Sequence, residues 1–521
     1  MKKSEPLTDR LARLPTPAAA LLLLAVIIPA LYFQWNPAFL NIGDNAHYLN
    51  VASAIYNGEG NVLPHSPGSP PNTHTPPGYP AILAALMWLS GGVSAIILFK
   101  LFSEIFALGF FIVAFIAMER HFDIGRGASF FILIFLALSP AISPVISGIM
   151  TEAPFLFFAA LVLLSALESE SGKMGWTIGA AIFAAAAIYI RLAALPLAAA
   201  VFVWYMINRR FRRGIIFGAI FLALMAPWTI WTISAGGPMY ISQASGLSGG
   251  ILARIISNAG EYLRIAFPAV FAPWGMGSIS GIFASVVLLM LALVGTVSNF
   301  KKIEVRLTSL WALATIPVYL GFSHVSFRYA AAIGFPLLFL AVIGARNLIS
   351  RAEASPKLAK TVKHLLPIAI LLSLIPSFVA NAGHTAEYRR ELAGDFAIDR
   401  IIPMTETDGE FYEALHWVRE NTPEDAVIIS SELRTAYFIS RRRGMFIGRS
   451  EGDEIWERAL KAGVDYLVVG NCSREIRGKL MSAMEPYRAC FNPAASFGSP
   501  PTYVVKIDHQ CLRESLEPSD N

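Results

Sequence analysis

Charged residues are scarce in this chain. Only 15% of its 521 residues are Asp, Glu, Lys or Arg, whereas soluble globular proteins average about 25%. The shortage is confined to residues 1–381, which hold 13 acidic and 24 basic residues; residues 382–521 hold 23 acidic and 17 basic residues. Together with 55% hydrophobic residues and a mean hydropathy of +0.55, this composition excludes an ordinary soluble protein. It predicts an integral membrane protein with a soluble tail.

Cysteines are few and nucleotide-binding motifs are missing. Cys472, Cys490 and Cys511 all lie in the tail, so an oxidising compartment would allow one disulfide and one free thiol. No Cys/His cluster suggests zinc, and no P-loop or glycine-rich dinucleotide turn suggests nucleotide chemistry. The net charge of +5 reflects basic cytoplasmic loops and not a nucleic-acid surface. The sequence therefore indicates no nucleic-acid partner and no certain cofactor, although histidines near the first outer loop make a divalent metal possible.

Long apolar runs dominate residues 1–381. A helix that crosses a bilayer needs about 20 predominantly apolar residues. We expect 11 to 13 spans, with the number between residues 78 and 207 left open. The candidate runs are 17–36, 78–92, 95–118, 127–145, 149–167, 175–207, 214–234, 279–299, 307–322, 327–348 and 364–381. The expected fold class is a polytopic α-helical membrane protein with a C-terminal soluble α/β domain.

Basic loops predict the orientation of these runs, because cytoplasmic loops carry an excess of Lys and Arg. Such clusters occur at residues 2–13, 209–213, 301–306 and 346–363. The N-terminus is therefore expected in the cytoplasm, and the run at 364–381 is expected to lead outward. This orientation places loops 37–77 and 235–278 outside. The membrane domain is expected to span residues 1–381, and the domain 382–521 is expected on the extracytoplasmic side.

The tail shows the alternation of an α/β domain. Residues 408–421 have apolar side chains at helical spacing, and Asn421-Thr422-Pro423 ends that helix before a strand at 426–430. The alternation continues through a segment at 437–440, a helix at 453–463, and strands at 466–470 and 503–507.

Asp44 is the leading catalytic candidate. It follows the first apolar run in Gly43-Asp44-Asn45-Ala46-His47-Tyr48, on the expected outer side, where acidic residues are few. Ionisable groups at the membrane are costly and are usually functional. The alternative is that Asp44 caps a short amphipathic helix at residues 45–57, which Gly58 would close.

A rigid segment, His-Thr-Pro-Pro-Gly-Tyr-Pro, occupies residues 74–80. Its prolines and glycine predict an extended approach to the second apolar run, and a plain helix start is the alternative. The preceding residues 57–73 are rich in Gly, Pro, Ser and Asn, so we expect a loop. His74 and Asp44 flank this loop, which predicts a cationic or hydrogen-bonding group beside the acid–base candidate.

Further polar candidates lie at the expected outer ends of apolar runs. Glu152 either faces the same cavity or favours a helix N-terminus. His324 and the pair Arg328-Tyr329 lie between two runs. Arginine there would give a phosphate charge-assisted hydrogen bonds, and an interfacial anchor is the alternative. Arg264 lies on an expected amphipathic helix of the second outer loop, which could instead rest on the lipid surface.

At these residues the sequence resembles a C-type (GT-C) membrane glycosyltransferase. More narrowly, it is similar to the bacterial relatives of protein O-mannosyltransferases and lipid A aminoarabinose transferases. The matching segments run through nearly the whole chain. They are Asp44 with Tyr48, Ala52 and Gly58; Pro76-Pro77-Gly78-Tyr79-Pro80; Ser147 to Pro154; Ala226-Pro227-Trp228; Arg328-Tyr329; and Ala414-Leu415-His416-Trp417-Val418 with Asn421-Thr422-Pro423.

The resemblance implies a sugar donor on a polyprenyl phosphate and inverting transfer at the outer face of a bacterial inner membrane. The acceptor would be a lipid, glycan or protein. Asp44 is implied as the general base, and His74, Arg264 and Arg328 as groups that bind the donor phosphate. The residues expected to line the substrate cavity are His47, Tyr48, Tyr79, Glu152, His324 and Tyr329.

Two positions depart from the family patterns. Aminoarabinose transferases carry Glu-Lys before the double proline, where this chain has His74 and Thr75, which argues against aminoarabinose as the donor. Mannosyltransferases often carry a second acid after the Asp, where this chain has Asn45, which argues against a protein acceptor. A transporter or flippase of lipid-linked sugars and a non-catalytic envelope scaffold are the alternatives. The lack of an internal repeat argues against a transporter.

Overall fold

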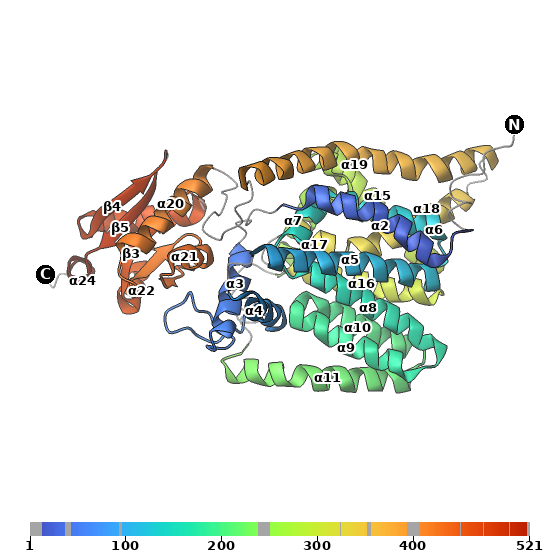
Figure 1. The fold of residues 1–521 in the computed structure, drawn as a ribbon, viewed down its shortest axis with the longest axis horizontal. Helices are drawn as coiled ribbons and strands as arrows, with labels where there is room; N and C mark the ends of the chain where they lie inside the picture. Colours follow the sequence, from blue (N-terminus) through green and yellow to red (C-terminus); the bar gives the residue numbers. More distant parts are fainter. Residues whose placement is uncertain are drawn as a thin grey trace. The chain divides into compact units, whose positions relative to one another are not determined.

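The computed structural model describes residues 13–36, 43–92, 96–237, 251–322, 325–351, 356–392, 406–448, 450–471, 474–499 and 501–517. The chain divides into two compact units, each built from several segments (Figure 1). Unit 1 comprises Met1–Pro37, Thr73–Gly78 and Lys100–Ala393, and unit 2 comprises Ala38–Asn72, Tyr79–Phe99 and Gly394–Asn521. The predicted domain boundary at residue 381 stays a prediction.

Apolar helices make up unit 1. They are α2 (Thr16–Gln34), α5 (Ile96–His121), α6 (Arg126–Leu138), α7 (Ser143–Ser147), α8 (Glu152–Glu168), α9 (Met174–Ile190), α10 (Leu195–Ile207), α11 (Phe211–Ser234), α13 (Ile251–Glu261), α14 (Phe267–Phe271), α15 (Ile279–Asn299), α16 (Ile303–Gly321), α17 (Phe327–Ala332), α18 (Gly334–Arg351) and α19 (Pro356–Leu392). The amphipathic helix expected in the second outer loop corresponds to α13, which continues as the π-helical turn η4 (Tyr262–Ala266).

Eight helices of the described ranges are long and apolar enough to cross a membrane, and α6 with its continuation to Ser147 forms a bent ninth candidate. Three shorter apolar helices lie at Gly78–Ser90, Met174–Ile190 and Leu192–Ile207. The run at 175–207 therefore forms two short helices. The helix breaks at Arg191, where the backbone is extended. These helices confirm the polytopic membrane class predicted from the sequence.

Close backbone contact determines how some of these helices pack. A Cβ on Gly295 would lie 2.0 Å from the Leu340 carbonyl oxygen, and one on Gly344 would lie 1.9 Å from that of Leu291. The glycines therefore let α15 and α18 approach each other, as small residues do in membrane helices.

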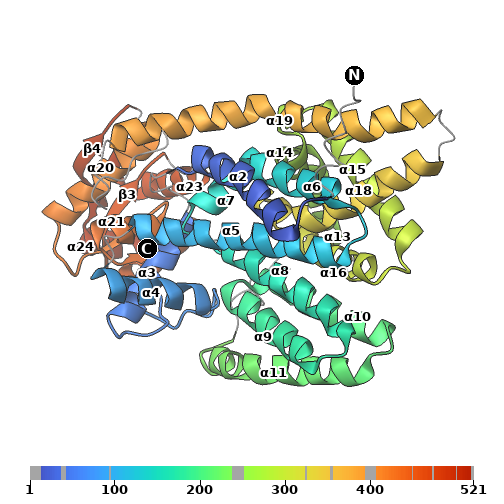
Figure 2. The same cartoon turned by 45° about the vertical axis from the view of Figure 1, so that its right-hand side comes forward.

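Helices α8 to α11 lie side by side in Figures 1 and 2. At one end of this group, Trp204 Nε1 donates to the Ile303 carbonyl at 3.0 Å.

A five-stranded sheet forms the core of unit 2. Its strands are β1 (Val427–Ser430), β2 (Gly444–Met445), β3 (Val464–Val469), β4 (Phe491–Phe497) and β5 (Thr502–Ile507), in the order β2-β1-β3-β5-β4. Strands β2, β1 and β3 are parallel, whereas β5 pairs antiparallel with both β3 and β4. The helices of unit 2 are α3 (Gly43–Tyr56), α4 (Gly78–Ser90), α20 (Glu406–Asn421), α21 (Leu433–Ser440), α22 (Asp453–Ala462), α23 (Arg474–Met484) and α24 (His509–Leu516).

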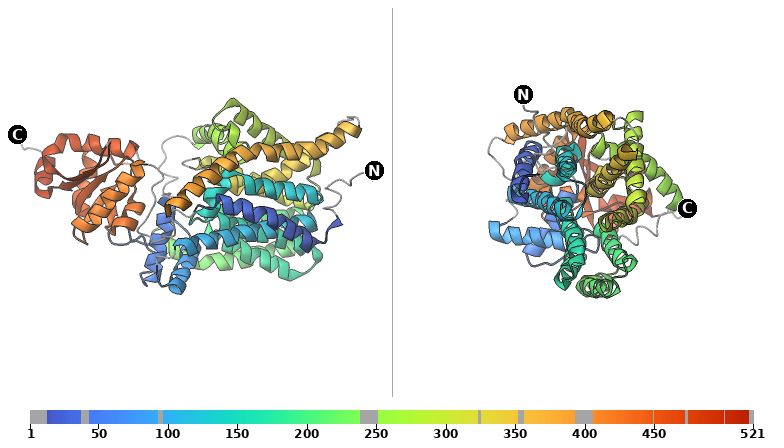
Figure 3. Two further views of the ribbon diagram at one scale, coloured as in Figure 1. Left: turned by 45° about the horizontal axis from the view of Figure 1, so that its top comes forward. Right: turned by 90° about the vertical axis from the view of Figure 1, so that its right-hand side faces the viewer.

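Helices cover both faces of this sheet (Figure 3). One face packs Ile429 and Leu467 against Trp456 of α22 and Leu512 of α24, because alternate strand residues point to opposite sides. On the other face, α20 packs on β4 and β5. The predicted α/β tail is therefore confirmed, with α20, β1, α22, β3 and β5 close to their expected positions. The segment at 437–440 is the end of α21, and β4 was not predicted.

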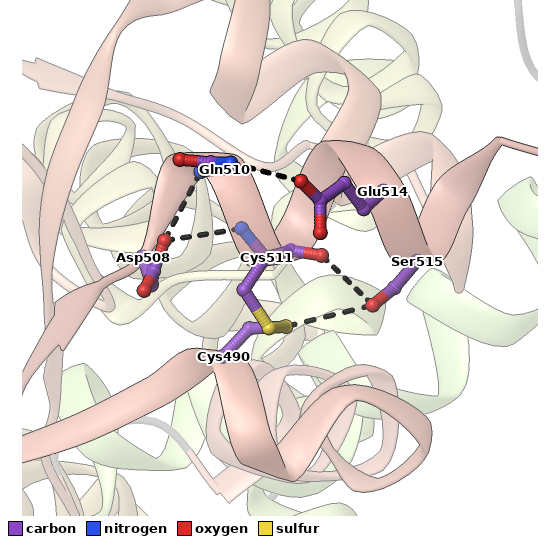
Figure 4. Close-up of a disulfide and its surroundings, with 6 residues drawn as sticks. All are labelled: Cys490, Asp508, Gln510, Cys511, Glu514 and Ser515. Carbon is purple, nitrogen blue, oxygen red and sulfur yellow. Dashed lines mark hydrogen bonds between the residues drawn. A yellow bond between two sulfur atoms is a disulfide. The ribbon is translucent and has the colours of Figure 1, made fainter.

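Cys490 and Cys511 form a disulfide at the end of the chain (Figure 4). It joins the turn just before β4 to α24, whose first turn is capped by Asp508. The Asp508 carboxylate accepts from the backbone amides of Gln510 at 3.1 Å and Cys511 at 3.0 Å. The sequence allowed one disulfide among three cysteines, and the structure selects this pair; Cys472 lies outside the described residues.

Candidate functional site

A buried charge cluster in unit 1 centres on Glu152. This residue opens α8, and its side chain is 1% exposed. Its Oε1 accepts from Arg191 Nη1 at 2.7 Å and from Arg328 Nε at 2.7 Å. Arg191 Nη1 also donates to Thr151 Oγ1 at 2.9 Å. Two guanidinium groups therefore share one carboxylate oxygen inside the helical unit.

Local backbone structure holds both arginines in place. Arg191 sits at the break between α9 and α10, where its backbone is extended. Arg328 lies in α17, whose first turn is capped when the Ser326 hydroxyl accepts from the Arg328 amide at 3.3 Å. Their side chains are only 11% and 14% exposed. Both arginines are therefore fixed by helix ends, which favours binding over loose surface contact.

Three tyrosines adjoin the arginines. Tyr319 and Tyr329 stack with their ring centroids 5.0 Å apart, and the Arg191 guanidinium lies over the Tyr329 ring at 5.4 Å. Tyr262, at the start of η4, is close enough to Arg191 and both other rings to interact electrostatically. Burial raises the pKa of Tyr262 well above its usual range. π-Helical turns often mark functional sites, and this one supplies a buried hydroxyl.

A second buried charge lies on α5. Lys100 is 1% exposed, and its Nζ donates to the Asn36 carbonyl at 2.5 Å. The Asn36 amide in turn donates to Ser147 Oγ at 3.1 Å. Neither Lys100 nor Arg191 was predicted as a site residue. A signal was available, since Arg191 is the only charge in the run 175–207 and Lys100 shares the run 95–118 with Glu104 alone, and charges inside apolar runs are costly and usually functional.

Asp44 lies in unit 2, within the first turn of α3. The helix begins at Gly43, so Asp44 is not its N-cap, and the capping alternative is wrong. Arg434 of α21 approaches the carboxylate, with Nη1 3.1 Å from Asp44 Oδ1. The two side chains are 33% and 35% exposed, which leaves Asp44 accessible from solvent. Gly58 has a φ of +82° and follows the helix end as expected.

Aromatic residues predicted for the cavity gather beside α3. His47 and Tyr48 are buried, and the Tyr48 ring meets Tyr79 edge to face at 5.1 Å. His47 also contacts His65, which was not predicted as a site residue, with ring centroids 6.1 Å apart. The structure therefore brings three predicted cavity residues together in unit 2 and adds a second histidine.

The remaining predicted residues are placed as follows. His74 is half-buried in unit 1, and Arg264 is exposed although Tyr262, two positions earlier, is buried. His324 lies outside the described residues. In the rigid segment, a Cβ on Gly78 would lie 2.6 Å from the Tyr189 carbonyl oxygen, which explains why glycine follows the two prolines. Among the described residues, no group of three or more His, Cys, Asp or Glu side chains could hold a metal ion.

The helical unit with its C-terminal α/β region has the fold of the C-type glycosyltransferases, as expected from the sequence. Crystal structures of ArnT from Cupriavidus metallidurans are similar in the undecaprenyl-phosphate complex (TM-score 0.54) and in the apo state (TM-score 0.57), both at 14% identity. The match to the complex covers 94% of this chain and 97% of that one.

Two other solved structures share this fold. The apo oligosaccharyltransferase from Archaeoglobus fulgidus matches at 12% identity with a TM-score of 0.56, over 92% of this chain and 74% of that one. The arabinofuranosyltransferase AftD from Mycobacteria matches at 15% identity with a TM-score of 0.51. The match covers 95% of this chain and 40% of that one. No protein-family model and no curated protein sequence matches the chain. The likeness is therefore one of fold.

Proposed function

We propose that the protein is an integral membrane glycosyltransferase that moves a sugar from a polyprenyl-phosphate donor to an envelope acceptor. The observation that carries the proposal is the Glu152 cluster, which places two buried guanidinium groups around one carboxylate, and guanidinium groups bind phosphate through charge-assisted hydrogen bonds. The fold supports it, because the ArnT that shares this fold was crystallised with undecaprenyl phosphate.

The position of the cluster along its helices supports transfer at the outer face. Glu152 begins α8 and Arg191 follows the end of α9. The opposite ends of these helices adjoin Glu170, which pairs with Arg210 of the basic loop. Since basic loops face the cytoplasm, this arrangement supports a position of the Glu152 cluster at the outer end. The disulfide of the C-terminal domain is also typical of an oxidising, extracytoplasmic compartment.

Asp44 serves as the general base in this proposal. It accepts the proton of the acceptor hydroxyl while that oxygen attacks the anomeric carbon. The bond between the anomeric carbon and the phosphate oxygen breaks, and its electron pair leaves with the lipid phosphate. A single displacement of this kind inverts the anomeric configuration. His47, Tyr48 and Tyr79 are proposed to line the cavity for the reacting groups.

The arginines receive the negative charge of the leaving group. Arg328 was predicted for this role, and Arg191 joins it because both guanidinium groups meet at Glu152. Fixed cations in a site shielded from water stabilise developing charge strongly. The roles of His74 and Arg264 as further phosphate ligands stay predictions. The same holds for Glu152 and Tyr329 as cavity residues. No step here uses a metal ion.

Sugar transfer from labelled polyprenyl-phosphate sugars, measured in membranes, tests the proposal. We expect the Asp44→Asn variant to lose transfer, and Arg328→Gln to weaken donor use about 10- to 100-fold, as the loss of a charged hydrogen bond does. Asp123→Asn, which changes a carboxylate that is 90% exposed, is the control and should act as wild type.

Equal transfer by wild type and Asp44→Asn at matched folded amounts would contradict the role of Asp44. No transfer with any donor would instead favour a transporter, flippase or scaffold. Movement of a lipid-linked sugar across vesicles without transfer would then identify the transporter.

A further inference from the structure

Arg434, the second residue of α21, belongs to the C-terminal domain, 390 positions after Asp44. Its guanidinium nevertheless makes the ion pair with the proposed general base. The contact is part of a wider attachment of α3 to α21. The chain therefore assembles the region around Asp44 from its first outer loop and from its tail.

Three further contacts fix this attachment. Asn50, which is fully buried, donates from Nδ2 to the Arg434 carbonyl at 2.9 Å. The Gly444 amide of β2 donates to the His65 carbonyl at 2.8 Å. A Cβ on Gly43 would lie 3.1 Å from Glu432 Oε2, so the residue before Asp44 lies directly against the residue before α21. These contacts set the position of α3 along α21.

The ion pair of the Arg434 side chain differs from the contacts that hold α3 against α21. The backbone of Arg434 is held through Asn50, whereas its guanidinium reaches a carboxylate that is itself one-third exposed. Ion pairs that solvent screens to this extent contribute little to folding. Catalysis is far more sensitive, because a misplacement of about 1 Å can cost about 10²-fold in rate.

We propose that Arg434 is a positioning residue that orients the Asp44 carboxylate for proton transfer, so that the C-terminal domain completes the active site. The inference rests on the proposed function, since it assumes that Asp44 is the base. Arg434 acts through Asp44 and needs no contact with the sugar donor. Loss of its guanidinium should therefore lower kcat and leave the KM for the donor nearly unchanged.

The test compares Arg434→Gln, Arg434→Lys and Arg488→Gln at equal folded amounts. Arg488 belongs to the same domain, is 75% exposed and pairs with Glu485 three positions earlier, so its variant controls for the loss of a surface cation. We expect Arg434→Gln to reduce kcat by about 10- to 100-fold with a donor KM within about twofold of wild type. Arg434→Lys should recover part of the rate, and Arg488→Gln should match wild type.

A double variant tests whether Arg434 works through Asp44. Residues that act as a unit are strongly non-additive, so Arg434→Gln should cause no further loss in an Asp44→Asn background. Multiplied losses would overturn the proposal, as would an unchanged kcat in Arg434→Gln. If Arg434→Gln does not fold, the kcat of Arg434→Lys decides: a wild-type value overturns the proposal.

The outcomes also separate this inference from the proposed function. If Asp44→Asn loses transfer and Arg434→Gln retains it, only the positioning role is wrong. If Asp44→Asn transfers sugar normally, the assignment of the base is wrong and the role of Arg434 falls with it.

Discussion

Arg328 donates from Nε to Glu152 Oε1 at 2.7 Å, and its Nη2 forms an ion pair with the same oxygen at 2.6 Å. The two residues are 176 positions apart and come from the ends of different helices. The same oxygen accepts from Arg191. One carboxylate thereby holds together two buried guanidinium groups that would otherwise repel each other, and the stability of the unit should depend on it.

Replacing Glu152 with Gln is therefore expected to destabilise the protein severely. The change keeps the shape of the side chain but removes the negative charge, and breaking a buried ion pair typically costs about 3–5 kcal/mol. Thermal unfolding in detergent measures the effect. Glu475→Gln, at a side chain that is 79% exposed, should change the midpoint little. If the Glu152→Gln protein were as stable as this control, the negative charge of Glu152 would not be needed to hold the two arginines in place.

The packing of α15 on α18 predicts a strict requirement for glycine at position 344. A Cβ there would lie 1.9 Å from the Leu291 carbonyl oxygen, and backbone atoms cannot yield as a flexible side chain can. Gly344→Ala should therefore force the helices apart, with a cost of about 1–3 kcal/mol, as overpacking usually has. The yield of folded protein and its unfolding midpoint report the change.

Gly175→Ala provides the control for that change, because a Cβ at Gly175, also on an apolar helix, meets nothing within 4 Å. This variant should be neutral or slightly stabilising, since alanine is the better helix former. Equal behaviour of the two variants would mean that α15 and α18 are less closely packed than described.

The sequence predicted the class of the fold because its evidence is local. Apolar runs, basic loops and the alternation of the tail each depend on neighbouring residues, and α2, α5 and α20 appear where those patterns indicate. Helix breaks were harder to predict. The run at 175–207 is apolar throughout apart from Arg191, so composition alone does not show that α9 ends at Ile190.

The site could be predicted only in part, because its contacts join distant segments. Arg328 and Glu152 were each selected by their residue type and position, but nothing in the sequence linked them. Arg434 carried no signal, since an arginine on a soluble helix is ordinary and its partner Asp44 lies 390 positions away. Arg191 carried a signal that was not used, namely a single charge within an apolar run.

The disulfide predicts the thiol content of the purified chain. With Cys490 and Cys511 joined and three cysteines in all, the denatured, unreduced protein should take up one maleimide, and three after reduction. Cys490→Ser should free a second thiol. It should also lower the stability of the C-terminal domain by about 3 kcal/mol, which is the typical contribution of a disulfide that closes a loop of about this length. Uptake of three maleimides without reduction would exclude the bridge.

The distribution of basic loops predicts that the C-terminal domain and the loop after α15 lie on opposite sides of the membrane. Single cysteines at two exposed positions, Lys301→Cys and Glu475→Cys, test this in a Cys472→Ser background, which keeps the disulfide. A membrane-impermeant maleimide applied from outside to spheroplasts should label position 475 at once, and position 301 only after permeabilisation. Cytoplasmic loops retain Lys and Arg because their transfer across the bilayer is unfavourable. The reverse labelling pattern would place the C-terminal domain in the cytoplasm. It would also remove Asp44 from the outer face, because α3 and α21 belong to the same unit.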